Sequence, residues 1–189
     1  MEHKIFAVHD ETTIRVYQAY GDAIANEAVR LGNFGESFKM TRMTWIKPSF
    51  LWMMYRSGWA AKERQTRVLA IDIKREGFDY IVKTAVASTF SKRAFETKAH
   101  WQVELAKSNI RVQWDPERDI YGNPLEQRTI QLGLKGDAVY KYVHDWIVNI
   151  TDITQDVIDI RQAITEKRFS NDMLPTELEY SCESISKDG

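Results

Sequence analysis

The chain of 189 residues is long enough to bury a sizeable core, and its apolar fraction of 43% and charged fraction of 28% exclude a disordered chain. The formal net charge of −1 excludes a broad field that would attract nucleic acid or an anionic membrane, so any such attraction must be local. A single Cys182 excludes an internal disulfide, and without a Cys-x-x-Cys or His-Glu-x-x-His pattern no metal site is predicted.

The first half of the chain is predicted to alternate between strands and helices. The strands are expected at residues 5–8, 13–20, 42–46 and 66–73. The helices are expected at residues 22–31, 48–57 and 76–86. Gly32 and Gly58 are suited to end the first two helices, and Pro48 is suited to the first turn of the second. This order indicates an α+β fold.

The next segment is predicted to contain a helix and a β-hairpin. Residues 88–107 have a mixed, polar pattern in which we expect a helix. Residues 109–114 and 128–134 are predicted strands, and the Pro116 region and the turn-forming residues 121–124 lie between them. Antiparallel pairing of these two strands is the simplest arrangement, and it favours a mainly antiparallel sheet core with flanking helices.

Two helices and a tail are predicted to complete the chain. A helix that starts at Asp137 is expected to carry its apolar stripe as far as Ile150, and a second helix follows after a break near Thr151. From residue 170 onward the chain is acidic and has little apolar periodicity. We therefore expect a single domain over residues 1–169 and a disordered tail over residues 170–189.

A basic and aromatic segment runs from Lys39 to Arg67. It contains seven basic residues against the single acid Glu63, a local net charge of +6 in a nearly neutral chain. Tryptophan and tyrosine residues are interleaved with the cations, so that groups able to hold phosphate and rings able to stack on a base occur together. A nucleotide or an RNA end would satisfy both. The equally weighted alternative is that the rings belong to the core and the cations form a solvated rim.

Three polar residues lie on predicted strands, where burial is costly unless each has a partner or faces a cavity: Arg15, Gln18 and Gln131. Alternation places Arg15 and Gln18 on opposite faces of one strand. A pocket would explain these residues. The alternatives are an ion pair of Arg15 with Asp10, Asp22 or Glu27 and a satisfied core amide for Gln18.

Several other classes of site are disfavoured. The four histidines have no metal-binding spacing, and no glycine-rich phosphate loop opens a helix. The acids between Asp115 and Asp119 are expected to be solvated loop charges beside Pro116. The sequence has no signal-peptide pattern and no apolar run of about 20 residues, so we expect a cytoplasmic protein with no membrane partner.

Three runs of sequence resemble a bacterial and fungal family catalogued as domain of unknown function four-two-nine-one. They are Ile14-Arg-Val-Tyr-Gln-Ala-Tyr20, the run from Thr41 to Trp59 with its Thr-Trp-Ile-Lys-Pro-Ser-Phe core, and Arg128-Thr-Ile-Gln-Leu-Gly-Leu134. The likeness covers nearly the whole chain except the tail. The family name implies no activity.

The chain also resembles, at the level of the fold, the ADP-ribosyltransferase superfamily. The run Val16–Tyr20 with its following helix looks like the first unit of that fold, and Met43–Ile46 looks like the second strand. The resemblance implies NAD-binding positions at Gln18 or Arg15, then at Thr44 or Trp45, and finally at Gln131. The sequence departs from the pattern because Gln131 replaces the catalytic acid, and a neutral amide cannot stabilise developing positive charge as a carboxylate does.

The leading hypothesis is an ADP-ribosyltransferase-like domain that binds NAD or a related nucleotide and acts on nucleic acid or its phosphates. A relative of the RNA 2′-phosphotransferases would suit the basic segment better than a protein-modifying toxin. Arg15, Gln18 and Gln131 are the catalytic candidates. The cofactor-binding candidates are Arg15, Tyr17, Gln18, Thr44, Trp45, Lys47, Tyr55 and Arg56. The alternatives are a non-catalytic module that binds RNA, DNA or a nucleotide through residues 39–67, and an interaction protein with no polar pocket.

Overall fold

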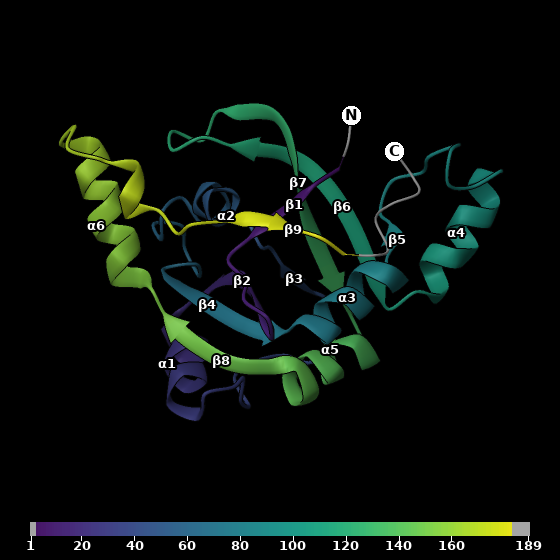
Figure 1. The fold of residues 1–189 in the computed structure, drawn as a ribbon. Helices are drawn as coiled ribbons and strands as arrows, with labels where there is room; N and C mark the ends of the chain where they lie inside the picture. The colour runs from purple at the N-terminus through teal and green to yellow at the C-terminus, as the bar shows by residue number, and fades with distance from the viewer. Residues whose placement is uncertain (1–2, 183–189) are drawn as a thin grey trace.

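The computed structural model describes residues 3–182 and shows a mixed α+β fold with antiparallel-rich sheets (Figure 1). The three-stranded sheet has the order β2 (Thr13–Tyr20), β4 (Arg67–Lys74), β8 (Ile147–Asp152). The four-stranded sheet has the order β3 (Thr44–Ile46), β7 (Pro124–Leu134), β6 (Ile110–Arg118), β5 (Val86–Ala87). The third sheet pairs β1 (Ile5–Ala7) with β9 (Leu178–Tyr180). Of these pairings, β5 with β6 is parallel and the others are antiparallel.

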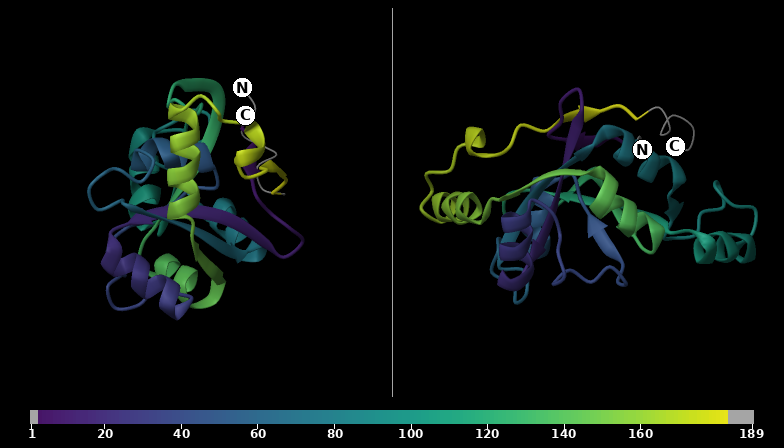
Figure 2. Two further views of the ribbon diagram at one scale, coloured as in Figure 1. Left: turned by 90° about the vertical axis from the view of Figure 1, so that its left-hand side faces the viewer. Right: turned by 90° about the horizontal axis from the view of Figure 1, so that it is seen from below.

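The helices flank the sheets, as the sequence predicts. They are α1 (Asp22–Leu31), α2 (Phe50–Ser57), α3 (Arg75–Thr84), α4 (Lys98–Lys107), α5 (Asp137–Lys141) and α6 (Thr154–Thr165). Gly32 and Gly58 end α1 and α2 with φ of 67° and 60°, a conformation that favours glycine. The helix expected within residues 88–107 is confirmed as α4, which has no buried residue and projects from the body of the molecule (Figure 2). None of the helices within residues 3–182 is long and apolar enough to cross a membrane.

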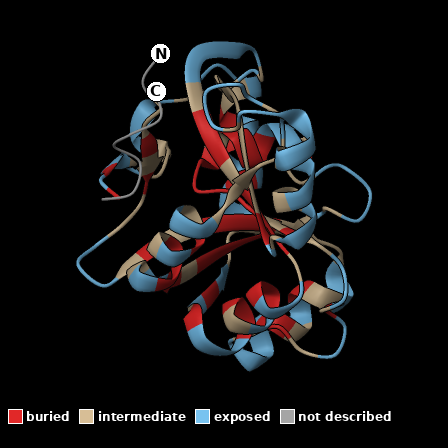
Figure 3. Ribbon diagram, turned by 90° about the vertical axis from the view of Figure 1, so that its right-hand side faces the viewer, coloured by how far each residue is buried: buried red, intermediate tan, exposed pale blue. Residues whose placement is uncertain are grey.

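The core lies on both faces of the β2–β4 pair. One apolar cluster joins side chains of the two larger sheets, such as Val16 on β2 and Leu132 on β7. On the other face, Tyr17 and Ala70 pack with residues of α2 and α6. Figure 3 shows the buried positions gathered along the strands and the inner sides of the helices. The alternation of β2 thus sends neighbouring side chains into different clusters.

The structure differs from the sequence prediction after α5. The expected helix as far as Ile150 instead ends in a π-helical turn, Tyr142–Trp146, and the chain continues as strand β8. Ile147 and Ile150 pair with Ile73 and Ile71 of β4, so that β-branched side chains lie on a pleated surface that suits them. The apolar residues recur as the sequence indicates, but they belong to a helix and a strand and not to one helix.

The segment after residue 169 also differs from the expected disordered tail. Residues Asn171–Met173 form a 3₁₀ turn, and β9 pairs with β1 so that Ala7 lies opposite Leu178. Tyr180 is 2% exposed, and its hydroxyl donates to Asp79 Oδ1 at 2.7 Å. Cys182 is also buried. The folded part therefore continues to residue 182, and residues 183–189 of the expected tail lie outside the described residues.

Candidate functional site

A cavity of about 780 Å³ opens where the two larger sheets meet α1 and α2. Its walls come from the end of β2, the start of α1, the segment around β3, one side of α2, and paired positions on β6 and β7. One backbone contact brings the two sheets together here, because Tyr17 N donates to Lys47 O at 2.7 Å. The cavity is therefore built from segments that lie far apart in the sequence.

Six of the nine residues named from the sequence line this cavity: Gln18, Thr44, Trp45, Lys47, Arg56 and Gln131. The other three, Arg15, Tyr17 and Tyr55, do not. The sequence prediction therefore named lining residues on β2, on α2, on β7 and on and just after β3. It was wrong to place both faces of β2 at one site.

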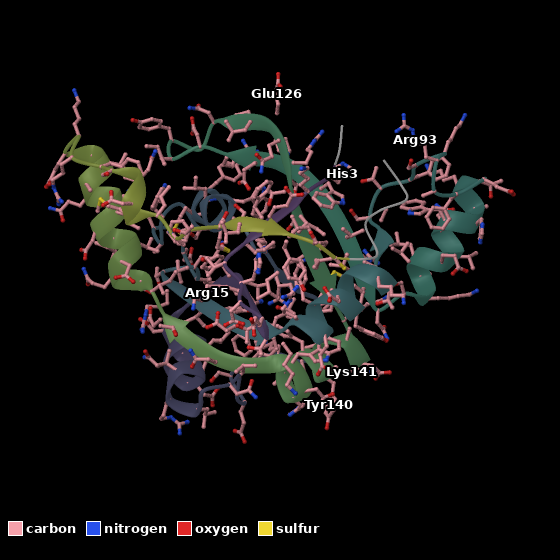
Figure 4. The ribbon with its side chains drawn as sticks, in the orientation of Figure 1. His3, Arg15, Arg93, Glu126, Tyr140 and Lys141 are labelled. Carbon is pink, nitrogen blue, oxygen red and sulfur yellow. The ribbon has the colours of Figure 1, made fainter. Side chains whose placement is uncertain are left out.

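Arg15 forms an ion pair on the face of β2 opposite to that of Gln18. Its Nε and Nη2 donate to the two oxygens of Asp72 at 2.8 and 2.9 Å, and the partner lies directly opposite on β4. The hydrogen bonds to Asp72 raise the pKa of Arg15. Figure 4 shows Arg15 among the central strands. The alternative of an ion pair is thus correct in kind, but the partner is not Asp10, Asp22 or Glu27.

Tyr17 and Tyr55 also point away from the cavity. Tyr17 is fully buried, packs edge-on against Phe50 with 5.6 Å between ring centroids, and burial raises its pKa. Tyr55 is 42% exposed on the outer side of α2, where the guanidinium of Arg118 lies 3.9 Å from its ring centroid. Neither ring is available to a ligand in the cavity.

Gln18 is the centre of a buried hydrogen-bond network. Its Nε2 donates to Tyr20 Oη at 2.8 Å and to Thr44 Oγ1 at 2.6 Å, and its Oε1 accepts from Tyr142 Oη at 2.8 Å. Burial raises the pKa of Tyr20 to about 12, so that its hydroxyl stays protonated. Both ends of the Gln18 amide are satisfied within the protein, which favours a core amide that positions Thr44 over direct ligand contact.

Gln131 belongs to a second network that the sequence revealed only in part. Gln113 and Gln131 are paired across β6 and β7, and their Nε2 atoms donate to the two oxygens of Asp115 at 2.9 and 2.5 Å. Asp115 lies on β6 and not in a solvated loop, because the hairpin is longer than predicted. The spacing of Gln113 and Asp115, two residues apart on one strand face, was the signal that could have identified them.

Lys47 is the most unusual residue of the cavity. It is 6% exposed, and its Nζ donates to Trp45 O at 3.3 Å and lies 5.5 Å from the ring centroid of Trp52. In the part of the chain that the structure describes, no carboxylate lies within ion-pair distance of this amine. Desolvation, helped by the charge of Arg56, lowers the pKa of Lys47 to about 7, and Asp115 opposes this only in part.

The basic segment supplies most of the charge around the cavity. Five of its seven cations line the walls: Lys39, Arg42, Lys47, Arg56 and Arg64. Of the other two, Lys62 donates to the carbonyl of Arg56 at 2.9 Å and Arg67 binds Asp152 and Asp22. Asp22 is the one carboxylate among the lining residues of the cavity in the described chain. Four of these five cations are exposed and Trp52 is buried, as the alternative of a solvated rim and core rings expects, so their position around one cavity leaves both interpretations open.

An indole forms part of the cavity wall beside this charge. Trp45 lies opposite Gly133 across β3 and β7, and a Cβ at Gly133 would lie 2.9 to 3.0 Å from three atoms of the ring. The glycine thus lets the indole lie against the backbone of β7. Trp45 remains partly exposed, as a surface for stacking requires.

The fold and the cavity together define a mixed α+β protein with a cation-rich, aromatic-walled pocket at the meeting of two sheets. The model of the family described as Domain of unknown function (DUF4291) matches residues 4–180. The chain belongs to this family, which confirms the first of the two resemblances. Searches of curated proteins and of solved structures gave no significant match.

Proposed function

We propose that the cavity binds NAD or a related nucleotide, as a domain similar to the ADP-ribosyltransferases would. The observation that carries the proposal is Lys47, a buried amine without a carboxylate partner, in a cavity whose walls hold four further cations and one acid. A buried cation is costly unless an anion compensates it. A phosphate group supplies that anion, and arginine recognises phosphate through paired hydrogen bonds.

The ligand contacts can be assigned from the geometry. Arg42 and Arg56 hold the phosphates, the amine of Lys47 meets the remainder of the ligand inside the cavity, and the indole of Trp45 stacks on the base or the nicotinamide ring. The Nε2 of Gln131 donates to Asp115, and in the proposed complex its Oε1 accepts a hydrogen bond from a ribose hydroxyl. The volume of the cavity is within the range of small-molecule sites.

The proposal concerns nucleotide binding, and a transfer reaction would be a further step at the same site. The third superfamily position is Gln131 rather than an acid, and the carboxylate of Asp115 is behind it, with an oxygen bonded to each of two glutamines. Transfer of ADP-ribose or action on nucleic-acid phosphates would therefore have to proceed without a carboxylate at the third superfamily position. The cationic wall is the feature that such chemistry would use to stabilise a phosphoryl group.

The test is thermal unfolding with and without NAD, ADP-ribose and a short 5′-phosphorylated RNA. A ligand that binds the folded state at 100 times its Kd adds about 2.7 kcal/mol to the free energy of unfolding. The shift should be lost in Arg56→Gln, which removes a cavity cation, and kept in Arg93→Gln, an exposed cation away from the cavity. If NAD and ADP-ribose give no shift, or if the Arg56→Gln variant responds like the parent chain, the proposal is wrong.

A non-catalytic RNA-binding module is the second candidate, favoured by the exposure of Lys39, Arg42, Arg56 and Arg64 at the rim. It predicts a thermal shift with the RNA alone that falls steeply as salt is raised. It also predicts that Gln131→Ala leaves the thermal shift with RNA unchanged, because phosphate contacts do not need a hydrogen-bond acceptor for the ribose.

A further inference from the structure

We propose that Lys47 is a nucleophilic amine that condenses with the aldehyde of a phosphorylated sugar held in the cavity. The inference rests on the proposed function, because it takes the cationic wall to hold the phosphate. It goes beyond binding, since it names a reactive atom, the Nζ of Lys47, and a class of ligand, a sugar phosphate or sugar nucleotide with a free reducing end. ADP-ribose is the member of this class closest to the proposed ligand.

The surroundings of Lys47 favour the neutral, reactive form of its amine more than an ordinary lysine site does. An ammonium group buried without a counter-ion is penalised, and the nearby Arg56 adds repulsion, which are the conditions that activate lysine for attack on carbonyl carbon. Within residues 3–182 the amine makes one hydrogen bond, which it donates to Trp45 O, and this bond does not use the lone pair of the neutral amine. Lys47 also lines the cavity, where a ligand can reach it.

The other cations of the cavity wall differ from Lys47 in their exposure to solvent, and this difference assigns them another role. Lys39, Arg42 and Arg56 are exposed at the rim. Their positions suit them to hold the phosphate of the ligand. Among the cavity cations of the described chain, Lys47 is then the buried one, while the groups that hold the phosphate are exposed.

The chemical step needs no further reactant. The lone pair of Nζ attacks the aldehyde carbon, and a first proton passes from the nitrogen to the former carbonyl oxygen, which becomes a hydroxyl group. The nitrogen then gives up its second proton as the C–O bond breaks, and this oxygen leaves as water. The product is an imine between Lys47 and the sugar carbon. Cyanoborohydride reduces the imine to a secondary amine, which leaves the chain heavier by the mass of the sugar nucleotide less one oxygen atom.

The experiment is incubation of the full chain with ADP-ribose and cyanoborohydride at pH 7, followed by intact mass and peptide mapping. A neutral fraction roughly a thousandfold larger than that of an ordinary lysine predicts at least about tenfold more adduct on Lys47 than on the exposed Lys83. NAD, which has no free aldehyde, is the negative control. The adduct should vanish in Lys47→Met and persist in Lys83→Met. If Lys47→Met does not fold, peptide mapping of the unaltered chain still shows whether the adduct is on Lys47.

Two other results separate this inference from the proposed function. If ADP-ribose stabilises the chain but Lys47 carries no adduct, or if the adduct is spread evenly over the lysines, the amine is not a nucleophile and the nucleotide site stands. If ADP-ribose neither stabilises the chain nor labels it, both the nucleophile and the nucleotide site are wrong.

Discussion

Replacement of Lys47 by methionine should change how the free energy of unfolding depends on pH. The side chain is 6% exposed, and burial lowers its pKa from 10.5 to about 7. The folded chain therefore releases this proton near pH 7 and the unfolded chain near pH 10.5. Between these values the unfolded state binds more protons, so the contribution of Lys47 to the free energy of unfolding rises with pH. Below pH 7 both states are protonated and the folded state carries the full cost of burying the charge.

The magnitude follows from the shift. Each pH unit between pH 7 and 10.5 changes the free energy of unfolding by about 1.4 kcal/mol, so the change between pH 6 and pH 9 is about 3 kcal/mol. Methionine fills a similar volume and has no charge to bury. The variant should accordingly be more stable than the parent chain at pH 6, and this advantage should shrink by about 3 kcal/mol at pH 9.

Urea unfolding of both chains at pH 6 and pH 9 measures this difference, in which the titration of all other groups cancels. Lys83→Met, at an exposed position of α3, is the matched control for replacing a lysine by methionine. A constant difference between the parent chain and Lys47→Met over this range would refute the reasoning, because it would show that Lys47 titrates normally or keeps a counter-ion in the folded state.

Three further results are expected. Gly133→Ala should lower the free energy of unfolding by about 1–3 kcal/mol and weaken nucleotide binding, measured by urea unfolding and thermal shift, because its Cβ would collide with the ring of Trp45. Arg15→Ala should lower stability by about 1–3 kcal/mol, leaving Asp72 unpaired, yet keep the thermal shift with ligand, since Arg15 lies outside the cavity. Burial raises the pKa of Glu177 to about 8, so Glu177→Gln should be more stable than the parent chain at pH 9 and similar to it at pH 4, by urea unfolding at both pH values.

The strands and helices of the first half could be predicted because their signals are local. Gly32 and Gly58 end helices in a left-handed conformation, and the alternation of β2 fixes which side chains share a face. The same alternation already separated Arg15 from Gln18. The error was to place both in one pocket, because the cost of burying Arg15 can be met by a cross-strand partner that the sequence does not identify.

The remaining differences arise from pairings between distant segments. Strand β9 forms because β1 offers an edge and Tyr180 finds Asp79 and Arg75 nearby, none of which leaves a periodic pattern in residues 170–182. Strand β8 continues an apolar stripe that begins in α5, so periodicity alone predicts a single helix. The Asp115 network likewise depends on the register of β6 against β7, which a sequence leaves open.

The backbone around Lys47 explains why its side chain is buried. Its carbonyl is bound to Tyr17 N on β2, and two residues later Ser49 caps α2 by accepting a hydrogen bond from Trp52 N. A lysine on a flexible loop would extend its charged end into water. Here a strand contact on one side and a helix start on the other fix the direction of the side chain. A chain selected only for stability would place an apolar residue at this position, and for this reason the proposed function assigns Lys47 to the ligand.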